Sequence, residues 1–197
     1  MKRRASFDRV TEGGSGDKED HMKKLSILAL LITIAIGTQG CQSMQPIETV
    51  STVDLDRFMG KWYVIANIPT FVETEAYNAV EAYALNDDGT IATTFTFHKG
   101  AFDGPVKTYR PKAFVRDGTS NAVWGMQFVW PFKAEYRIIY LDDAYSLTVI
   151  GRTKRDYVWV MARTPTIPEA DYDRIVAFIE TKGYDRNKIQ RVPQQDR

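Results

Sequence analysis

Cysteine and histidine are almost absent from this chain. Its 197 residues contain one cysteine, Cys41, and two histidines, His21 and His98. A single cysteine excludes an intramolecular disulfide, and a zinc site built from Cys and His ligands is close to excluded. We therefore expect neither a structural metal nor a cofactor.

The chain also lacks an excess of charge of one sign. It carries 26 Lys and Arg against 25 Asp and Glu, a formal net charge of +1. A nucleic-acid-binding protein usually shows a clear basic excess, so we expect no nucleic-acid partner. Hydrophobic residues make up 44% and charged residues 26%, which is close to the globular average and disfavours global disorder and a polytopic membrane protein. Aromatic residues, at 12%, are frequent, which indicates packing or binding by rings.

The N-terminal region has the features of a targeting signal followed by a membrane anchor. Residues 1–21 are polar and aperiodic, and we interpret them as disordered or as an over-long gene start, with Met22 as the alternative start. After Lys23-Lys24, an apolar run of 12 residues extends from Leu25 to Ile36. A helix of that length rises ~18 Å, too short for a bilayer core of ~30 Å, and typical of a signal peptide. We assign 22–40 to the signal peptide and 41–53 to a tether.

From Gly60 onward the hydrophobic period is two, which predicts strands. The predicted strands are Gly60–Ile68, Ala76–Leu85, Thr90–His98, Lys107–Arg116, Ala122–Trp130, Ala134–Leu141, Ser146–Arg152 and Tyr157–Arg163. Turn signals such as Asn86-Asp87-Asp88-Gly89 separate them, and short connections favour antiparallel neighbours. Eight meandering strands suggest a sandwich or a closed up-and-down barrel, and closure would leave a lumen for one small ligand.

Alternation assigns one bulky, aromatic face to three of these strands. Its members are Trp124, Met126, Phe128 and Trp130 in the fifth strand, Tyr136, Ile138 and Tyr140 in the sixth, and Trp159 in the eighth. Such stripes are more often plain core than a cavity, but tyrosine hydroxyls and methionine favour a lumen, because a full core prefers Leu, Ile and Val.

One helix should follow the last strand. Thr166 and Glu169 fit a capping box with Thr166 as the N-cap. The apolar stripe of this helix is Tyr172, Ile175, Val176 and Ile179, and Gly183 fits the C′ position. The helix should lie outside the sheet, against Val158, Val160 and Ala162.

Two residues about 100 positions apart should close one end of a barrel. Trp62 begins the first strand and Arg163 ends the eighth, and these strands pair in an up-and-down barrel. The Arg163 guanidinium can then lie over the Trp62 ring, a cation–π pair of ~1–2 kcal/mol.

Two family resemblances follow from these motifs. Gly37-Thr38-Gln39-Gly40-Cys41 resembles the lipobox of bacterial lipoproteins, although Thr38 and Gln39 depart from it. This resemblance implies lipidation of Cys41, and Gln42 in place of an aspartate implies delivery to the outer membrane. Residues 54–194 resemble the lipocalins, most closely the bacterial outer-membrane lipocalins related to apolipoprotein D. The segments that carry this second resemblance are Asp54–Tyr63, Asn86–Gly89, Trp130–Phe132 and Asp156–Ile167; the middle motif is loose at Leu141–Tyr145.

The lipocalin resemblance implies an all-β fold, an eight-stranded antiparallel calyx with one C-terminal helix packed outside. It also implies a binding protein for fatty acids or lysophospholipids, active in membrane maintenance under stress, and it suggests a homodimer. We expect the ligand to contact the lumen residues Trp124, Met126, Phe128, Tyr136, Ile138, Tyr140 and Trp159. Lys133, in the turn at the mouth, is a candidate for the head group, although an ordinary solvated lysine is the commoner case.

Other functions stay open at this point. A haem or tetrapyrrole could occupy the calyx, with His98 or a tyrosine as ligand, or the protein could be a structural envelope lipoprotein with a filled barrel. An enzyme is disfavoured, because no nucleophile has a base in reach and no Walker or Rossmann glycine pattern occurs. Glu73, Glu75 and Glu81 could face the mouth or the lumen, but such carboxylates are usually solvated.

Overall fold

The computed structural model describes residues 44–195. Cys41 and the segments 1–21 and 22–40 lie outside these residues. Between 44 and 195, no helix combines the length and the apolar character needed to cross a bilayer.

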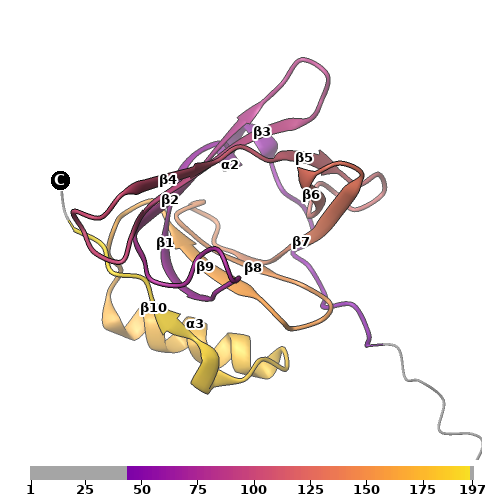
Figure 1. Ribbon diagram of the computed structural model, residues 1–197. Coiled ribbons are helices and arrows are strands. Elements are labelled where there is room, and N and C mark those ends of the chain that lie inside the picture. The colour runs from indigo at the N-terminus through magenta and orange to yellow at the C-terminus, as the bar shows by residue number, and fades with distance from the viewer. Residues whose placement is uncertain (1–43, 196–197) are drawn as a thin grey trace, which may run out of the picture. The chain divides into compact units, whose positions relative to one another are not determined.

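The architecture is a closed antiparallel barrel of eight strand positions, with one C-terminal helix outside it (Figure 1). The strands are β1 (Gly60–Ile68), β2 (Ala76–Leu85), β3 (Ile91–Lys99), β4 (Val106–Tyr109), β5 (Lys112–Val115), β6 (Val123–Val129), β7 (Phe132–Leu141), β8 (Leu147–Gly151), β9 (Val158–Ala162) and β10 (Gln190–Arg191). Consecutive strands pair except β4 with β5 and β9 with β10. β10 pairs with β1, and β9 also pairs back with β1, with Val64 opposite Met161. The barrel fold predicted from the sequence is confirmed.

The fourth predicted strand, 107–116, is divided into β4 and β5. Both halves pair with β3, and only β5 pairs with β6. Pro111 lies in the break, and proline has no N–H to donate to a ladder, although its carbonyl accepts a hydrogen bond from Thr93 N at 3.1 Å. The two halves therefore occupy one position in the barrel.

The strand directions define two ends. The connections 69–75, 100–105, 130–131 and 152–157 lie at one end, which we call the open end. The connections 86–90, 116–122 and 142–146 lie at the other, the base, together with α2 (Leu55–Phe58), a single turn that the sequence analysis did not predict.

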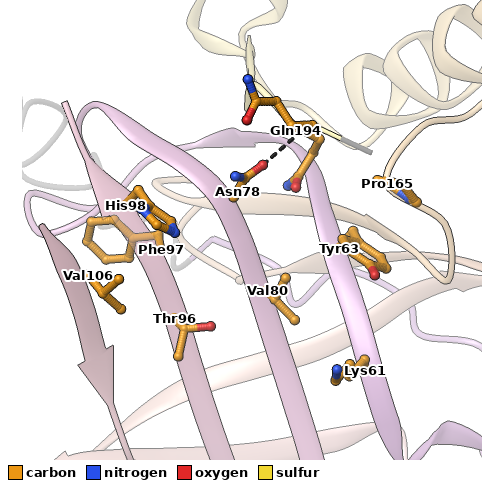
Figure 2. A pocket seen from close by; sticks show the side chains of 11 residues that line it. Lys61, Tyr63, Asn78, Val80, Thr96, Phe97, His98, Val106, Pro165 and Gln194 are labelled. Atoms are coloured by element: carbon orange, nitrogen blue, oxygen red, sulfur yellow. Dashed lines mark hydrogen bonds between the residues drawn. The ribbon is translucent and has the colours of Figure 1, made fainter. Parts of the chain in front are cut away.

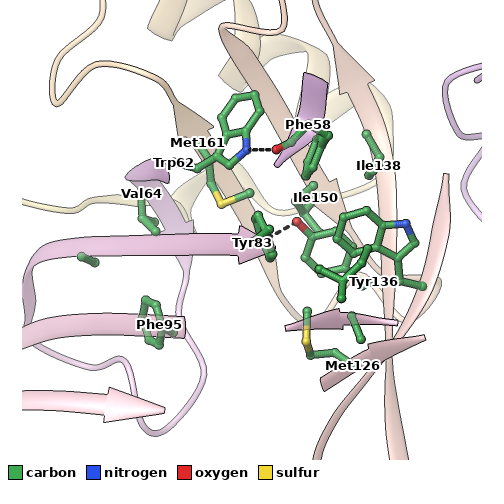
Figure 3. Packing of buried hydrophobic residues seen from close by; sticks show 14 of the residues in the cluster. Phe58, Trp62, Val64, Tyr83, Phe95, Met126, Tyr136, Ile138, Ile150 and Met161 are labelled. Atoms are coloured by element: carbon green, nitrogen blue, oxygen red, sulfur yellow. Dashed lines mark hydrogen bonds between the residues drawn. The ribbon is translucent and has the colours of Figure 1, made fainter. Parts of the chain in front are cut away.

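The base is filled by an aromatic layer (Figure 3). Phe58 of α2 is fully buried, with its ring 5.0 Å from Trp62 and 5.3 Å from Trp124. Trp62 donates its indole N–H to the Phe58 carbonyl at 2.8 Å. Tyr136 stacks on Trp124 at 4.8 Å. This end of the barrel is therefore packed core.

The C-terminal helix α3 (Glu169–Thr181) covers the outer face of the sheet (Figure 1). Ile175 and Ile179 belong to one buried cluster with Val158, Val160 and Ala162, as predicted. Gly183, with φ +90°, ends the helix as its C′ residue, and its N–H bonds to the Glu180 carbonyl at 3.0 Å.

The predicted capping box of α3 is wrong. The N-cap is Pro168, which makes no side-chain cap hydrogen bond. Thr166 lies two residues before it, too early to cap the first turn, and its carbonyl instead accepts a hydrogen bond from Thr164 Oγ1 at 2.7 Å.

Candidate functional site

Arg163 connects the last strand to the turn that closes the base. Its Cζ lies 3.8 Å from the centroid of the buried Trp62 ring. The guanidinium donates to five carbonyls, those of Arg57, Phe58, Met59, Lys61 and Tyr145, at 2.7–3.2 Å. Burial lowers the pKa of Arg163, but the cationic form still dominates at neutral pH. The ring contact was predicted from the sequence but the carbonyls were not, because α2 and its C-cap residue Met59 supply three of them.

The middle motif, Leu141–Tyr145, also stabilises the base of the barrel. Asp142 accepts hydrogen bonds from Ser146 N at 2.6 Å and Leu147 N at 3.0 Å, which shape the turn and lower the pKa of its carboxyl against the opposing effect of burial. The Tyr145 hydroxyl accepts a hydrogen bond from Asp54 N at 2.8 Å. This turn therefore connects the N-terminal segment to the bottom of the barrel.

The open end leads to a cavity of about 90 Å³ inside the barrel. Its apolar wall consists of Val72, Phe95, Pro111, Met126, Phe128, Ala134, Tyr136 and Trp159. Polar side chains complete it: Thr70, Glu73, Glu81, Thr93, Glu135 and Arg152. It is the candidate ligand site of the described chain, because it joins concavity, apolar walls and a few polar groups inside a closed barrel.

Glu81 brings a carboxyl into the interior. Burial raises its pKa to about 8, and the charge of Glu73 adds to the effect. At neutral pH this carboxyl is therefore mostly protonated. Glu81 hydrogen-bonds the Tyr83 hydroxyl, which lies 2.8 Å from the Tyr136 hydroxyl. Burial, and then the Glu81 charge, raises the pKa of Tyr136 well above its usual value, so the Tyr136 hydroxyl is neutral.

Glu73 fastens the 69–75 connection over the cavity. Its carboxylate accepts hydrogen bonds from the Trp159 indole N–H at 2.9 Å and from Thr70 N and Oγ1, both at 2.9 Å. The residue is only 5% exposed. Of the three glutamates singled out in the sequence, Glu73 and Glu81 line the cavity, whereas Glu75 is exposed and pairs with Lys99 at 3.3 Å.

Two polar atoms in the cavity wall have no partner among the described residues. They are Thr93 Oγ1 and Arg152 Nε. Arg152 uses its Nη1 to pair with Asp156 Oδ2 at 3.3 Å, and its side chain is 18% exposed. An unpartnered buried donor is costly, so both atoms are available to a polar group of a ligand. Neither residue was predicted from the sequence, although alternation with Phe95 and Phe97 places Thr93 on the inner face.

Of the predicted lumen residues, four line the cavity and two lie below it in the packed base. Met126, Phe128, Tyr136 and Trp159 line the cavity, although Phe128 is 56% exposed at the rim. Trp124 and Ile138 also point inward, but they lie in the packed base layer. Trp124 donates its indole N–H to the Asn121 carbonyl at 2.7 Å.

The prediction that Tyr140 lines the lumen is wrong. A β-bulge between Ile138 and Tyr140 inserts Ile139, which reverses the alternation. Tyr140 therefore faces outward, where its ring lies 5.6 Å from Phe178 of α3 and its hydroxyl accepts a hydrogen bond from Arg174 at 3.0 Å.

The prediction that Lys133 meets a head group at the mouth is also wrong. β7 begins at Phe132, so Lys133 belongs to the strand and not to the turn. Its side chain packs along Gly125, and its Nζ lies 3.5 Å from the centroid of the Phe114 ring. Ala113 and Trp124, the neighbours of Phe114 and Gly125, are the inward residues, so Lys133 lies on the outer wall.

His98 lies outside the lumen. It lines an external groove of about 740 Å³ over β1 to β4, with Lys61, Asn78 and Gln194 among its other residues (Figure 2). Its Nδ1 is 3.1 Å from the Gly104 carbonyl. The C-terminal segment forms one side of this groove, where Gln194 Nε2 bonds the carbonyls of Val64 and Ala79 at 2.9 and 3.0 Å. A lumen ligand cannot reach His98 from inside the barrel.

Comparison with known proteins agrees with this geometry. The family model described as Lipocalin-like domain matches residues 53–194. The chain is 30% identical to Outer membrane lipoprotein Blc of Citrobacter freundii over 85% of this chain and 96% of that one. It is 29% identical to Temperature-induced lipocalin-1 of Arabidopsis thaliana over 76% and 83% of the two chains. Insecticyanin of Manduca sexta has the same fold, with a TM-score of 0.60 over 76% of this chain and 85% of that one, at 13% identity. The chain belongs to the lipocalin-like family.

Proposed function

We propose that this protein binds a lipid with a single acyl chain, a fatty acid or a lysophospholipid, in the lumen of its barrel. The observation that carries the proposal is the cavity at the open end, where an apolar wall meets the unpartnered Thr93 Oγ1 and Arg152 Nε. Each buried CH₂ contributes about 0.8 kcal/mol, and ordering and association costs remove part of that gain.

The size of the cavity determines how a long chain would enter. About 90 Å³ is well below the roughly 300 Å³ of an ordinary small-molecule site. A long acyl chain therefore requires the 69–75 connection to move outward, which breaks the hydrogen bonds of Glu73 to Thr70 and Trp159. The base cannot supply the space, because Trp62 and Trp124 are fully buried in it.

The charges of the cavity bear on the head group. Arg152 offers an N–H to a phosphate or carboxylate oxygen. Glu73, Glu81 and Glu135 line the same space, so a negative charge on the ligand that is not paired with a cation would be unfavourable. These side chains therefore best fit a head group whose anion pairs with Arg152, or one that carries a cation beside its anion.

The relatives support a location and a role. Proteins named Outer membrane lipoprotein Blc match most of this chain, which supports lipidation at Cys41 and attachment to the outer membrane. In this proposal residues 22–40 are removed as a signal peptide, 41–53 form the tether, and the lipid-binding domain serves storage or transport in membrane maintenance. The role is non-catalytic.

Fluorescence of Trp159 tests the proposal, because this ring lines the cavity and its N–H holds Glu73. Titration with a fatty acid and with a lysophospholipid should change the emission saturably, at one ligand per barrel. Trp159→Phe should remove the signal, and Arg152→Gln should weaken binding, whereas Arg116→Gln, an exposed change at the base, should not. Absence of saturable binding by either lipid, in a correctly folded protein, would reject the proposal in favour of a structural envelope protein.

A further inference from the structure

Large apolar side chains are exposed around the open end. Five of them lie in the 69–75 connection or at and beside the turn from β6 to β7: Phe71 at 86%, Trp130 at 81%, Phe132 at 77%, Val129 at 68% and Phe128 at 56%. Such clustering is unusual for a soluble surface, where exposed apolar residues are normally scattered. At the base, Leu85 is exposed to only 43%.

These side chains flank the entrance of the cavity from two sides. The 69–75 connection joins β1 to β2, while β6 and β7 lie across the barrel, separated from them by β3 and β5 on one side and by β8 and β9 on the other. Both groups reach the cavity, since Val72 and Phe128 line it. A surface that covered the exposed rings would therefore also cover the entrance.

The N-terminal segment leaves the barrel at the same end. It passes from the base, where Val53 N bonds the Ser120 carbonyl at 3.0 Å, along β7, where Arg137 Nε bonds the Ile47 carbonyl at 2.9 Å. It reaches the open end where Arg155 Nη1, in the 152–157 connection, bonds the Gln45 carbonyl at 2.6 Å. Cys41 lies three residues before Met44, and three residues span at most about 11 Å. A lipid on Cys41 would therefore hold the open end, not the base, close to the membrane.

Charges at the open end carry both signs. Lys154 is exposed there, and so are Glu75 and Asp103. Ionic attraction to an acidic partner is thus not the driving feature. Exposed Trp and Phe side chains instead suit the interface of a bilayer, where such rings bury apolar area beside polar head groups.

We propose that the open end is a membrane-docking surface, in which Phe71, Trp130 and Phe132 enter the head-group region of a lipid bilayer and the cavity opens onto it. The orientation gives a lipid a direct path between the bilayer and the lumen. It goes beyond the proposed lipid binding and does not require it, because a barrel with an unfilled lumen would dock in the same way.

Trp130 provides the test, since it is the exposed tryptophan, whereas Trp62 and Trp124 are fully buried. The full chain is reconstituted in phosphatidylcholine vesicles whose acyl chains carry bromine, which quenches nearby tryptophan. We expect strong quenching that Trp130→Phe reduces several-fold; equal quenching of the natural protein and Trp130→Phe would show that the Trp130 ring does not enter the bilayer and would overturn the docking proposal. A reporter introduced at the base by Leu85→Trp, in the Trp130→Phe background, should remain unquenched.

Matched variants complete the test. Phe71→Ser with Phe132→Ser should lower the quenching of Trp130 several-fold, while Leu85→Ser should leave it unchanged, and raised salt should have little effect. Without vesicles, Trp130 should be fully accessible to the aqueous quencher acrylamide. Protection in solution would mean that a second copy covers the patch, and equal quenching at positions 130 and 85 would mean no preferred orientation; either result contradicts the proposal.

Discussion

Glu81 gives the sharpest prediction for the stability of this protein. Its carboxyl lies inside the barrel, and burial, with the nearby charge of Glu73, raises its pKa to about 8 from the usual 4.5. Between those two values the folded state keeps a proton that the unfolded state has released. The free energy of unfolding should therefore fall as the pH rises through this window, and level off above pH 8.

The magnitude follows from the same two values. Each pH unit in the window costs about 1.4 kcal/mol for one proton, so an ionised Glu81 destabilises the fold by at most about 5 kcal/mol above pH 8. Glu81→Gln replaces the neutral acid by a group of the same shape that cannot ionise, and its amide oxygen can still accept the Tyr83 hydrogen bond. The stability advantage of the variant should be small near pH 5 and about 3 kcal/mol at pH 7.

Urea unfolding followed by tryptophan fluorescence, at intervals from pH 5 to pH 9, measures this difference. Glu75→Gln is the control, because Glu75 is exposed and makes only a surface ion pair with Lys99; its difference from the natural protein should stay nearly constant with pH. A parallel pair of curves for the natural protein and Glu81→Gln would show that Glu81 ionises freely in the folded state, and the account of the polar lumen would fail.

Three further predictions concern residues away from Glu81. Arg163→Ala should destabilise the protein by about 2–4 kcal/mol in urea unfolding, because five carbonyls lose a charged donor. Lipid affinity per folded molecule should hardly change. Arg163→Lys should restore only part of the lost stability, since an ammonium lacks the guanidinium fork. Lys133→Ala should leave lipid titrations unchanged and lower stability by about 1 kcal/mol or less, as it removes only an exposed cation–π contact. Cys41→Ser should abolish incorporation of a palmitate analogue, and unchanged labelling would place the lipid elsewhere.

Most of the fold could be predicted from local patterns, because a half-buried strand must alternate and a short turn must be polar. β1 and β2 have the predicted bounds, and the pairing of β1 with β9 follows from Trp62 and Arg163 lying at the two ends of the barrel sequence. The break at Pro111 was also visible in the sequence, since proline cannot donate to a ladder, yet 107–116 was predicted as one strand.

The site was harder to predict, because its parts depend on where alternation fails. Register shifts occur in β1, β2, β6 and β7, and none of them has a glycine or proline to announce it. The polar groups of the cavity could not be predicted either, because no sequence motif marks Thr93 or Arg152. Only closure of the barrel brings β3 and the 152–157 connection to one cavity. The turn α2 is four residues long, too short to leave a periodic signal.

Tyr140 and Trp159 separate the two descriptions of the lumen by experiment. Strict alternation along β7 places the Tyr140 ring inside, as alternation along β9 does for Trp159, whereas the bulge at Ile139 turns Tyr140 outward onto Phe178 and Arg174. Trp159→Glu should therefore weaken lipid binding strongly, because it puts an unpaired charge into the cavity and removes the donor to Glu73. Tyr140→Glu should leave lipid affinity nearly unchanged and instead lower stability by about 1–3 kcal/mol, through lost packing against α3, in part compensated by the nearby Arg174. Both variants are first checked by circular dichroism, and affinity is then measured with a fluorescent fatty acid. Equal losses of affinity in the two variants would mean that Tyr140 faces the lumen and that the bulge is absent from the folded protein in solution.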